Sequence, residues 1–138
     1  MQNNNVKIFI SIIVLLVVGT IAAVLLQSSS NSVPAGPGKY DAFAQCLKDK
    51  GATFYGAFWC PHCQAQKKEF GSSAKLLPYV ECSTADGAGQ TQICIDKKIT
   101  GYPTWELADG TRIPDDSTDG AGVKLETLAA KTGCVLPQ

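Results

Sequence analysis

Two cysteines separated by a proline and a histidine, Cys60 and Cys63, constrain this chain more than any other feature of its sequence. The run 52–59 before them is apolar and aromatic, which is typical of a central strand buried on both faces. Pro61 suits the first turn of a helix, and good helix formers follow it up to Gly71. The pair is therefore predicted at a strand-to-helix junction.

A sulfur at the start of a helix meets unpaired N–H groups and the positive end of the helix macrodipole, which favour the thiolate over the thiol. We expect Cys60 to be the attacking nucleophile and Cys63, one turn later and more shielded, to be the resolving cysteine. A protonated His62 would stabilise the reduced thiolate further and make the disulfide a better oxidant. The alternative for His62 is an exposed helical residue without a role.

Hydrophobic periodicity in the rest of the chain alternates between helix and strand. Besides the helix that begins at Pro61, the pattern predicts helices over 40–50, 90–99 and 123–132 and strands over 52–59, 76–82, 104–107 and 111–113. Gly51 and Gly133 stand where the first and last of these helices would end. The order predicts an α/β fold with a small central sheet covered by helices on both sides.

Composition limits the class of protein. About a hundred residues follow the linker, enough for one core and not for two. The formal net charge is zero, with acids and lysines interleaved, so we expect no nucleic-acid partner. Six cysteines in so small a domain are unusual in a reducing cytosol and ordinary in an oxidising compartment.

The N-terminus predicts export. The stretch from Ile8 to Leu26 carries no charge and would span roughly 28 Å as a helix, close to the hydrocarbon thickness of a bilayer. We expect a short tail (1–7), a transmembrane signal-anchor helix (8–26), a flexible Ser, Pro and Gly linker (27–39) and one folded domain (40–138). Lys7 favours a cytoplasmic N-terminus and an extracytoplasmic domain. The alternative is a cleaved signal peptide, which would export the domain as well.

Two short motifs and the order of the elements carry a family resemblance. "WCPHC" after the first predicted sheet strand, "TGYPTW" near residue 104 and the order of the elements resemble the thioredoxin superfamily, and the Cys-Pro-His-Cys motif is that of DsbA-like oxidases. The segments 43–71, 77–83 and 99–110 resemble more closely the thioredoxin-like domain fused to bacterial vitamin K epoxide reductase homologues. The resemblance implies a thioredoxin-like fold with a mixed sheet of about four strands.

The resemblance also implies roles for single residues. Pro103 matches the cis-proline of the superfamily, and with Gly101 and Tyr102 it would present backbone to a substrate beside the cysteines. Trp59 matches the tryptophan before the first cysteine and is expected to pack over the sulfurs. Many thioredoxins carry a buried acid six residues before that cysteine, and this chain has Phe54 there.

The remaining four cysteines allow three pairings. Because Cys82 ends a strand and Cys94 lies on the next helix, we expect a Cys82–Cys94 disulfide, and with it Cys46–Cys134. Cys60, Cys63, Cys82 and Cys94 could instead hold zinc, but the spacing of the second pair does not suit such a site. The segment 115–126 partly matches a calcium-binding loop, although an acidic surface loop is the simpler reading. We therefore expect neither a metal nor a cofactor.

These expectations combine into one functional hypothesis. The chain is predicted to be a membrane-tethered thiol:disulfide oxidoreductase outside the cytoplasm, in the periplasm or at the cell exterior. It would donate the Cys60–Cys63 disulfide to exported protein thiols, and a separate membrane enzyme of the vitamin K epoxide reductase or DsbB type would reoxidise it. Two alternatives are a disulfide reductase of the cytochrome-maturation type and a redox-silent module that binds extended peptides.

Overall fold

The computed structural model describes residues 2–27 and 36–138, and most of the predicted linker 27–39 lies outside these residues. The chain divides into an N-terminal unit and a compact unit from Ala35 to Gln138. In the first unit the structure describes one helix, α1 (Gln2–Gln27), whose large apolar side chains from Val6 to Ile21 are about half exposed or more. No helix in the described ranges has both the length and the apolar character that crossing a membrane requires.

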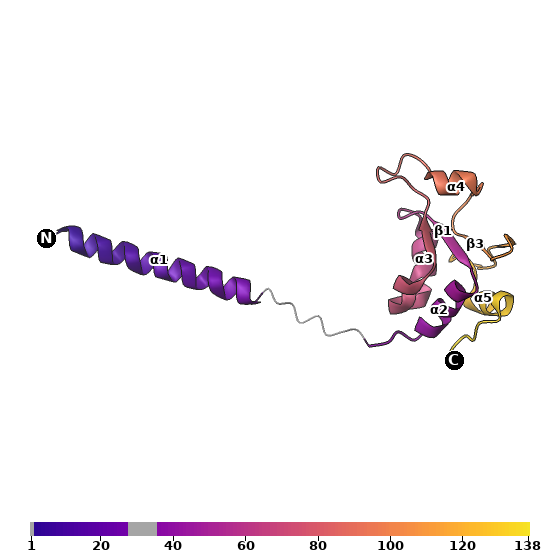
Figure 1. The fold of residues 1–138 in the computed structure, drawn as a ribbon, viewed down its shortest axis with the longest axis horizontal. Helices are drawn as coiled ribbons and strands as arrows, with labels where there is room; N and C mark the ends of the chain where they lie inside the picture. Colours follow the sequence, from indigo (N-terminus) through magenta and orange to yellow (C-terminus); the bar gives the residue numbers. More distant parts are fainter. Residues whose placement is uncertain (1, 28–35) are drawn as a thin grey trace. The chain divides into compact units, whose positions relative to one another are not determined.

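The compact unit contains helices and strands in the order that the sequence predicts, with one 3-10 helix in addition (Figure 1). Its elements are α2 (Asp41–Asp49), β1 (Thr53–Gly56), α3 (Pro61–Phe70), the 3-10 helix η1 (Gly71–Leu76), β2 (Tyr79–Glu81), α4 (Gln92–Asp96), β3 (Thr104–Glu106), β4 (Arg112–Ile113) and α5 (Leu125–Thr132). Gly51 and Gly133 both adopt positive φ, at 73°, at the ends of α2 and α5. The α/β prediction is confirmed.

The four strands form one mixed sheet in the order β2-β1-β3-β4. Strand β1 runs parallel to β2 and antiparallel to β3, and β3 and β4 form an antiparallel hairpin. In this register Phe54 lies between Tyr79 of β2 and Trp105 of β3. The strand that leads to the cysteine pair is therefore at the centre of the sheet.

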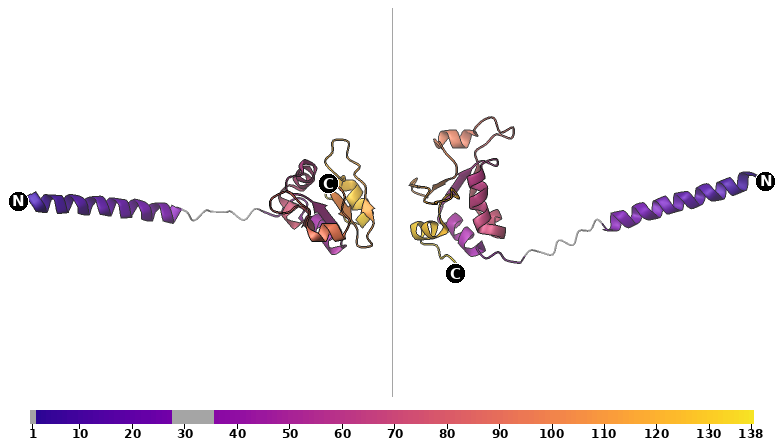
Figure 2. Two further views of the ribbon diagram at one scale, coloured as in Figure 1. Left: turned by 90° about the horizontal axis from the view of Figure 1, so that it is seen from above. Right: turned by 180° about the vertical axis from the view of Figure 1, so that it is seen from behind.

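The two faces of the sheet pack against different helices. The face that carries Phe54 and Trp105 belongs to the larger hydrophobic cluster, which includes side chains from α2, α3 and α5. The opposite face carries Tyr55, which packs in a smaller cluster with Cys94 of α4 and Ile99. Figures 1 and 2 show α2 and α5 at one end of this unit and α4 at the other.

Some boundaries differ from the prediction. The run 52–59 does not continue as a buried strand: β1 ends at Gly56, and Phe58 and Trp59 are each 50% exposed. The chain turns after Gly56 because the N–H of Cys60 donates to the carbonyl of Ala57, which places Cys60 at the start of α3. Strand β2 begins only after Pro78, which has no N–H to give to a sheet.

Two disulfides link elements of the compact unit, one over a long and one over a short sequence separation. Cys46 of α2 is bonded to Cys134, after α5, with Cα atoms 5.8 Å apart. Cys82, directly after β2, is bonded to Cys94 of α4, with Cα atoms 5.5 Å apart. These are the two pairs predicted from the sequence, and they leave Cys60 and Cys63 as free thiols.

Candidate functional site

Cys60 is the N-cap residue of α3. Its extended backbone (φ −76°, ψ 117°) precedes Pro61 at the first helical position, and its sulfur accepts the backbone N–H of Cys63 at 3.4 Å. Such a sulfur occupies the place of a capping oxygen, where an N–H donor stabilises negative charge. Cys60 is 4% exposed and Cys63 is fully buried, so an incoming sulfur reaches Cys60 first.

The environment of Cys63 favours its thiol form. Burial, together with a hydrogen bond to Cys60, raises the pKa of Cys63 to about 12. A backbone hydrogen bond at Ala57 and, after it, the positive charge of Lys67 act in the opposite direction and lower this pKa. Because the thiolate is the nucleophile, the two cysteines of the pair are suited to different steps of an exchange.

The loop before β3 lies beside the first sulfur. The Tyr102–Pro103 peptide bond is cis, and the carbonyl of Tyr102 accepts a hydrogen bond from the thiol of Cys60 over 3.7 Å. The hydroxyl of Tyr102 accepts from the side-chain amide of Gln90 at 2.7 Å. Gly101 is exposed, with no atom near the place where a side chain would begin. The structure thus brings Cys60 next to the backbone that precedes the proline.

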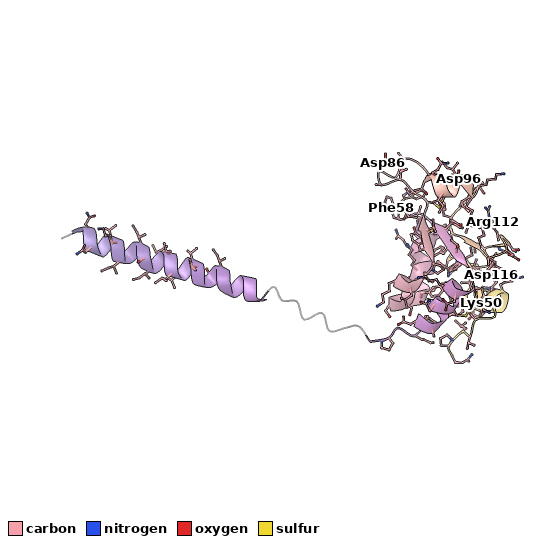
Figure 3. The ribbon with its side chains drawn as sticks, viewed as in Figure 1. Lys50, Phe58, Asp86, Asp96, Arg112 and Asp116 are labelled. Atoms are coloured by element: carbon pink, nitrogen blue, oxygen red, sulfur yellow. A yellow bond between two sulfur atoms is a disulfide. The ribbon has the colours of Figure 1, made fainter. Side chains whose placement is uncertain are left out.

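Two aromatic residues border the site. The indole N–H of Trp59 donates to the hydroxyl of Ser83 at 2.8 Å, and its ring meets that of Tyr102 edge-on, with centroids 6.0 Å apart. Phe58 lies at the end of the unit that also carries Asp86, as Figure 3 shows. A Cβ atom on Gly87 would lie within 4 Å of both aromatic rings. The half-exposed rings therefore form an apolar rim next to Cys60.

His62 is exposed and its Nδ1 atom contacts the carbonyl oxygen of Gly120. This contact joins the start of α3 to the acidic loop 115–122. Two carboxylates of that loop are engaged in local turns: Asp115 accepts from the N–H of Ser117 at 2.9 Å, and Asp119 accepts from that of Ala121 at 3.2 Å. The third, Asp116, accepts from the N–H of Lys124 at 2.9 Å, at the start of α5. Over the described ranges, no group of three His, Cys, Asp or Glu residues is arranged to hold a metal ion.

Gln66 is a site residue that the sequence analysis missed. Its side chain is fully buried in α3; Oε1 accepts from the N–H of Val123 at 2.8 Å and from the indole of Trp105 at 3.2 Å, and Nε2 donates to the carbonyl of Val123 at 3.0 Å. A Cβ atom on Gly122 would lie 2.5 Å from this Oε1 atom and 2.9 Å from Cγ of Pro103. Gln66 thus holds the segment that packs on the cis-proline.

Glu81, at the end of β2, was also missed. Its carboxylate accepts from the hydroxyl of Tyr79 at 2.7 Å, from the N–H of Ser83 at 2.8 Å and from the N–H of Phe58 at 3.2 Å. Partial burial opposes ionisation, but these hydrogen bonds outweigh it and hold the pKa of Glu81 below its usual value. Glu81 therefore anchors the turn that delivers Cys60. In the sequence only its position at the end of a predicted strand pointed to it.

Comparisons with known proteins agree on one family. The family profile described as Thioredoxin matches residues 39–132. Thiol-disulfide oxidoreductase LTO1 of Arabidopsis thaliana is 42% identical over 101 residues, which make up 70% of this chain and 25% of that protein. Protein disulfide-isomerase of Humicola insolens is 28% identical over 94 residues, which make up 67% of this chain and 18% of that protein. The chain thus spans a quarter or less of these relatives.

Proposed function

The chain belongs to the thioredoxin family, and from this premise we propose that it is a thiol:disulfide oxidoreductase that acts outside the cytoplasm and donates the Cys60–Cys63 disulfide to exported proteins. One observation carries the proposal: the sulfur of Cys60 caps α3, accepts the N–H of Cys63 and lies beside the Tyr102 carbonyl. A relative that is 42% identical bears the name thiol-disulfide oxidoreductase.

The reaction needs only sulfur chemistry. A substrate thiolate attacks Sγ of Cys60 in the Cys60–Cys63 disulfide, the S–S bond breaks, and Cys63 leaves as a thiolate that then takes up a proton. A second substrate thiolate attacks the substrate sulfur of the mixed disulfide and releases Cys60 as a thiolate. The substrate loses two electrons and two protons in forming its disulfide, and the cysteine pair gains the two electrons.

Two features support the oxidative direction: the position of Cys60 at the start of α3, and the residue at position 54. The sulfur of Cys60 caps α3 and accepts the N–H of Cys63, and any contact that favours the reduced form of such a pair makes its disulfide a better oxidant. Phe54 stands where many thioredoxins carry a buried acid, so a proton acceptor that serves efficient reduction is missing from that position. Oxidation of exported thiols is therefore favoured over the reductase alternative.

Location and partners form the second half of the proposal. The uncharged stretch 8–26 supports a single membrane anchor with an extracytoplasmic domain, and the two further disulfides suit an oxidising compartment. The likeness to the domain fused to vitamin K epoxide reductase homologues suggests that a quinone-linked membrane enzyme of that type, or of the DsbB type, regenerates the disulfide. No metal or organic cofactor is required of this chain.

Covalent trapping tests the proposal. In a Cys63→Ala chain the Cys60 thiolate can attack a disulfide of an exported protein and expel one of its sulfurs as a thiolate. Cys63 is then absent and cannot attack the mixed disulfide to release the protein, so we expect exported proteins to accumulate on Cys60 in the host cell. The Cys60→Ala chain is the matched control and should capture nothing. A trap that stays empty contradicts every redox version of the function, and a strongly reducing potential of the wild-type pair, measured against glutathione, contradicts the oxidative direction.

A further inference from the structure

The strand position next to the cysteine pair is apolar in this chain. Phe54 is fully buried and its ring stacks on Trp105, so it offers neither a proton acceptor nor a countercharge to Cys63. Burial raises the pKa of Cys63 to about 12. When Cys63 leaves a disulfide as a thiolate, a backbone hydrogen bond at Ala57 stabilises that charge, and a nearby positive charge would make the step faster still.

Cys63 and Tyr79 face each other across Gly56. A Cβ atom on Gly56 would lie 2.9 Å from Sγ of Cys63 and 2.9 Å from Cε2 of Tyr79. Lys67 follows Cys63 by about one helical turn and lies on the same side of α3. Its Nζ atom is 3.2 Å from the centroid of the Tyr79 ring. The buried sulfur and the ammonium group thus share one aromatic neighbour.

The ring of Tyr79, on which the ammonium group rests, is itself held by a hydrogen bond. The hydroxyl of Tyr79 donates to Glu81, which fixes the ring on which Lys67 rests. Burial lowers the pKa of Lys67, while the negative charges of Glu81 and of an ionised Cys63 act against this shift. The titratable groups that face Cys63 are therefore Cys60 and Lys67 on its own helix and Tyr79 on β2, with Glu81 behind Tyr79.

We propose that Lys67 is a positioning residue for this chemistry: its ammonium charge stabilises the Cys63 thiolate, and Tyr79 and Glu81 hold that charge in place. This inference rests on the proposed function, because it concerns the step in which Cys63 is released. As the Cys60–Cys63 bond breaks, its electron pair passes to Sγ of Cys63, which has the Tyr79 ring as a neighbour in common with the positive charge of Lys67. The thiolate then takes its proton from water, so Lys67 transfers no proton itself.

The test uses the full chain with Cys60→Ser, which leaves Cys63 as the one free thiol among the six cysteines. Ionisation of Cys63 is followed by the ultraviolet absorbance of the thiolate and by the rate of alkylation with iodoacetamide. We expect Lys67→Met to slow alkylation about tenfold at a fixed pH, as a shift of about one pH unit in ionisation requires. Lys67→Arg keeps the charge and should restore alkylation to within about threefold of the parent.

Lys68→Met is the matched control, because Lys68 is the next residue of α3 and is exposed. It should leave the titration of Cys63 unchanged, and all variants should keep the circular dichroism of the parent. Equal titration curves for Lys67→Met and Lys68→Met overturn the inference. So does a Lys67→Arg chain that behaves like Lys67→Met, because the inference requires only the charge.

A second assay separates this inference from the proposed function. Chains with the Cys60–Cys63 disulfide are mixed with a peptide that carries two thiols, and peptide oxidation is timed. We expect the Lys67→Met chain to oxidise the peptide several-fold more slowly than the Lys68→Met chain. A wild-type chain that oxidises no peptide overturns the proposed function, whereas normal oxidation with an unmoved Cys63 titration overturns only the role of Lys67.

Discussion

The rings of Phe54 and Trp105 stack nearly parallel across strands β1 and β3, with centroids 4.9 Å apart and planes inclined by 8°. Both side chains are fully buried, and the edge of the Tyr79 ring packs on Phe54 from the other neighbouring strand, at 5.2 Å between centroids. This aromatic row fills the centre of the sheet directly before the cysteine pair. An acid in place of Phe54 would leave a carboxylate surrounded by rings.

The first prediction concerns this row. Phe54→Ala removes a fully buried ring and leaves a cavity, so we expect the free energy of unfolding to fall by about 3–5 kcal/mol in urea titrations. Phe58→Ala is the matched control, since Phe58 is 50% exposed, and its effect should stay within about 0.5 kcal/mol. Similar losses for the two variants would contradict the described core.

The second prediction concerns the two thiols. At neutral pH, iodoacetamide should alkylate Cys60 in a Cys63→Ala chain at least about a hundredfold faster than Cys63 in a Cys60→Ala chain. The reason is that burial raises the pKa of Cys63 to about 12, so very little of it is thiolate, and its sulfur is fully buried as well. Rates within a factor of a few of each other would show that both sulfurs are equally reactive.

The third prediction concerns pH and the stability of the reduced chain. Because folding raises the pKa of Cys63 from 9.0 to about 12, mainly through burial, the native state keeps a proton that the unfolded chain loses. The stability from this thiol is fully present below pH 9.0 and is lost as the pH rises toward about 12.

In that range the free energy of unfolding of the reduced wild type should fall more steeply than that of reduced Cys63→Ala, by up to about 1.4 kcal/mol per pH unit. Denaturant titrations at several pH values measure the two slopes, and the other titrating groups are the same in both chains. Parallel slopes would contradict the raised pKa of Cys63.

The fourth prediction concerns Gln66. Gln66→Ala leaves the N–H and carbonyl of Val123 and the indole N–H of Trp105 without their partner, so a loss of about 2–4 kcal/mol in the free energy of unfolding is expected. Gln64→Ala, on the exposed side of the same helix, should cost no more than about 1 kcal/mol. An unchanged free energy of unfolding in Gln66→Ala would mean that other contacts hold the segment around Val123.

The fifth prediction compares the two disulfides. The Cys46–Cys134 bridge closes a separation of 88 residues and Cys82–Cys94 one of 12, so the longer loop restricts the unfolded chain more. Replacing both members by serine should cost about 4–5 kcal/mol for the first pair and about 3 kcal/mol for the second. Thermal and urea unfolding of the two double variants measure the difference, and the reverse order would rule out loop length as the main cause.

Local sequence signals were sufficient for much of this molecule. The cysteine pair at a helix start follows from Pro61 and the residues around it, and the end of α5 follows from Gly133, because caps and helical periodicity depend on neighbours within one or two turns. The same local signals predicted the order of the helices and strands. They also misplaced Phe58 and Trp59, since an apolar run does not reveal where a strand must turn away from the sheet.

Tertiary structure alone decided how the site is supported. The contacts of Gln66 with Val123 and of Glu81 with Phe58, and the closeness of Lys67 to the ring of Tyr79, join residues from separate elements. A polar side chain in the sequence has no fixed partner, because any donor or acceptor brought near it by folding can satisfy it. The local sequence therefore determined which sulfur caps the helix. Long-range packing determined which charges and carbonyl groups surround the two cysteines.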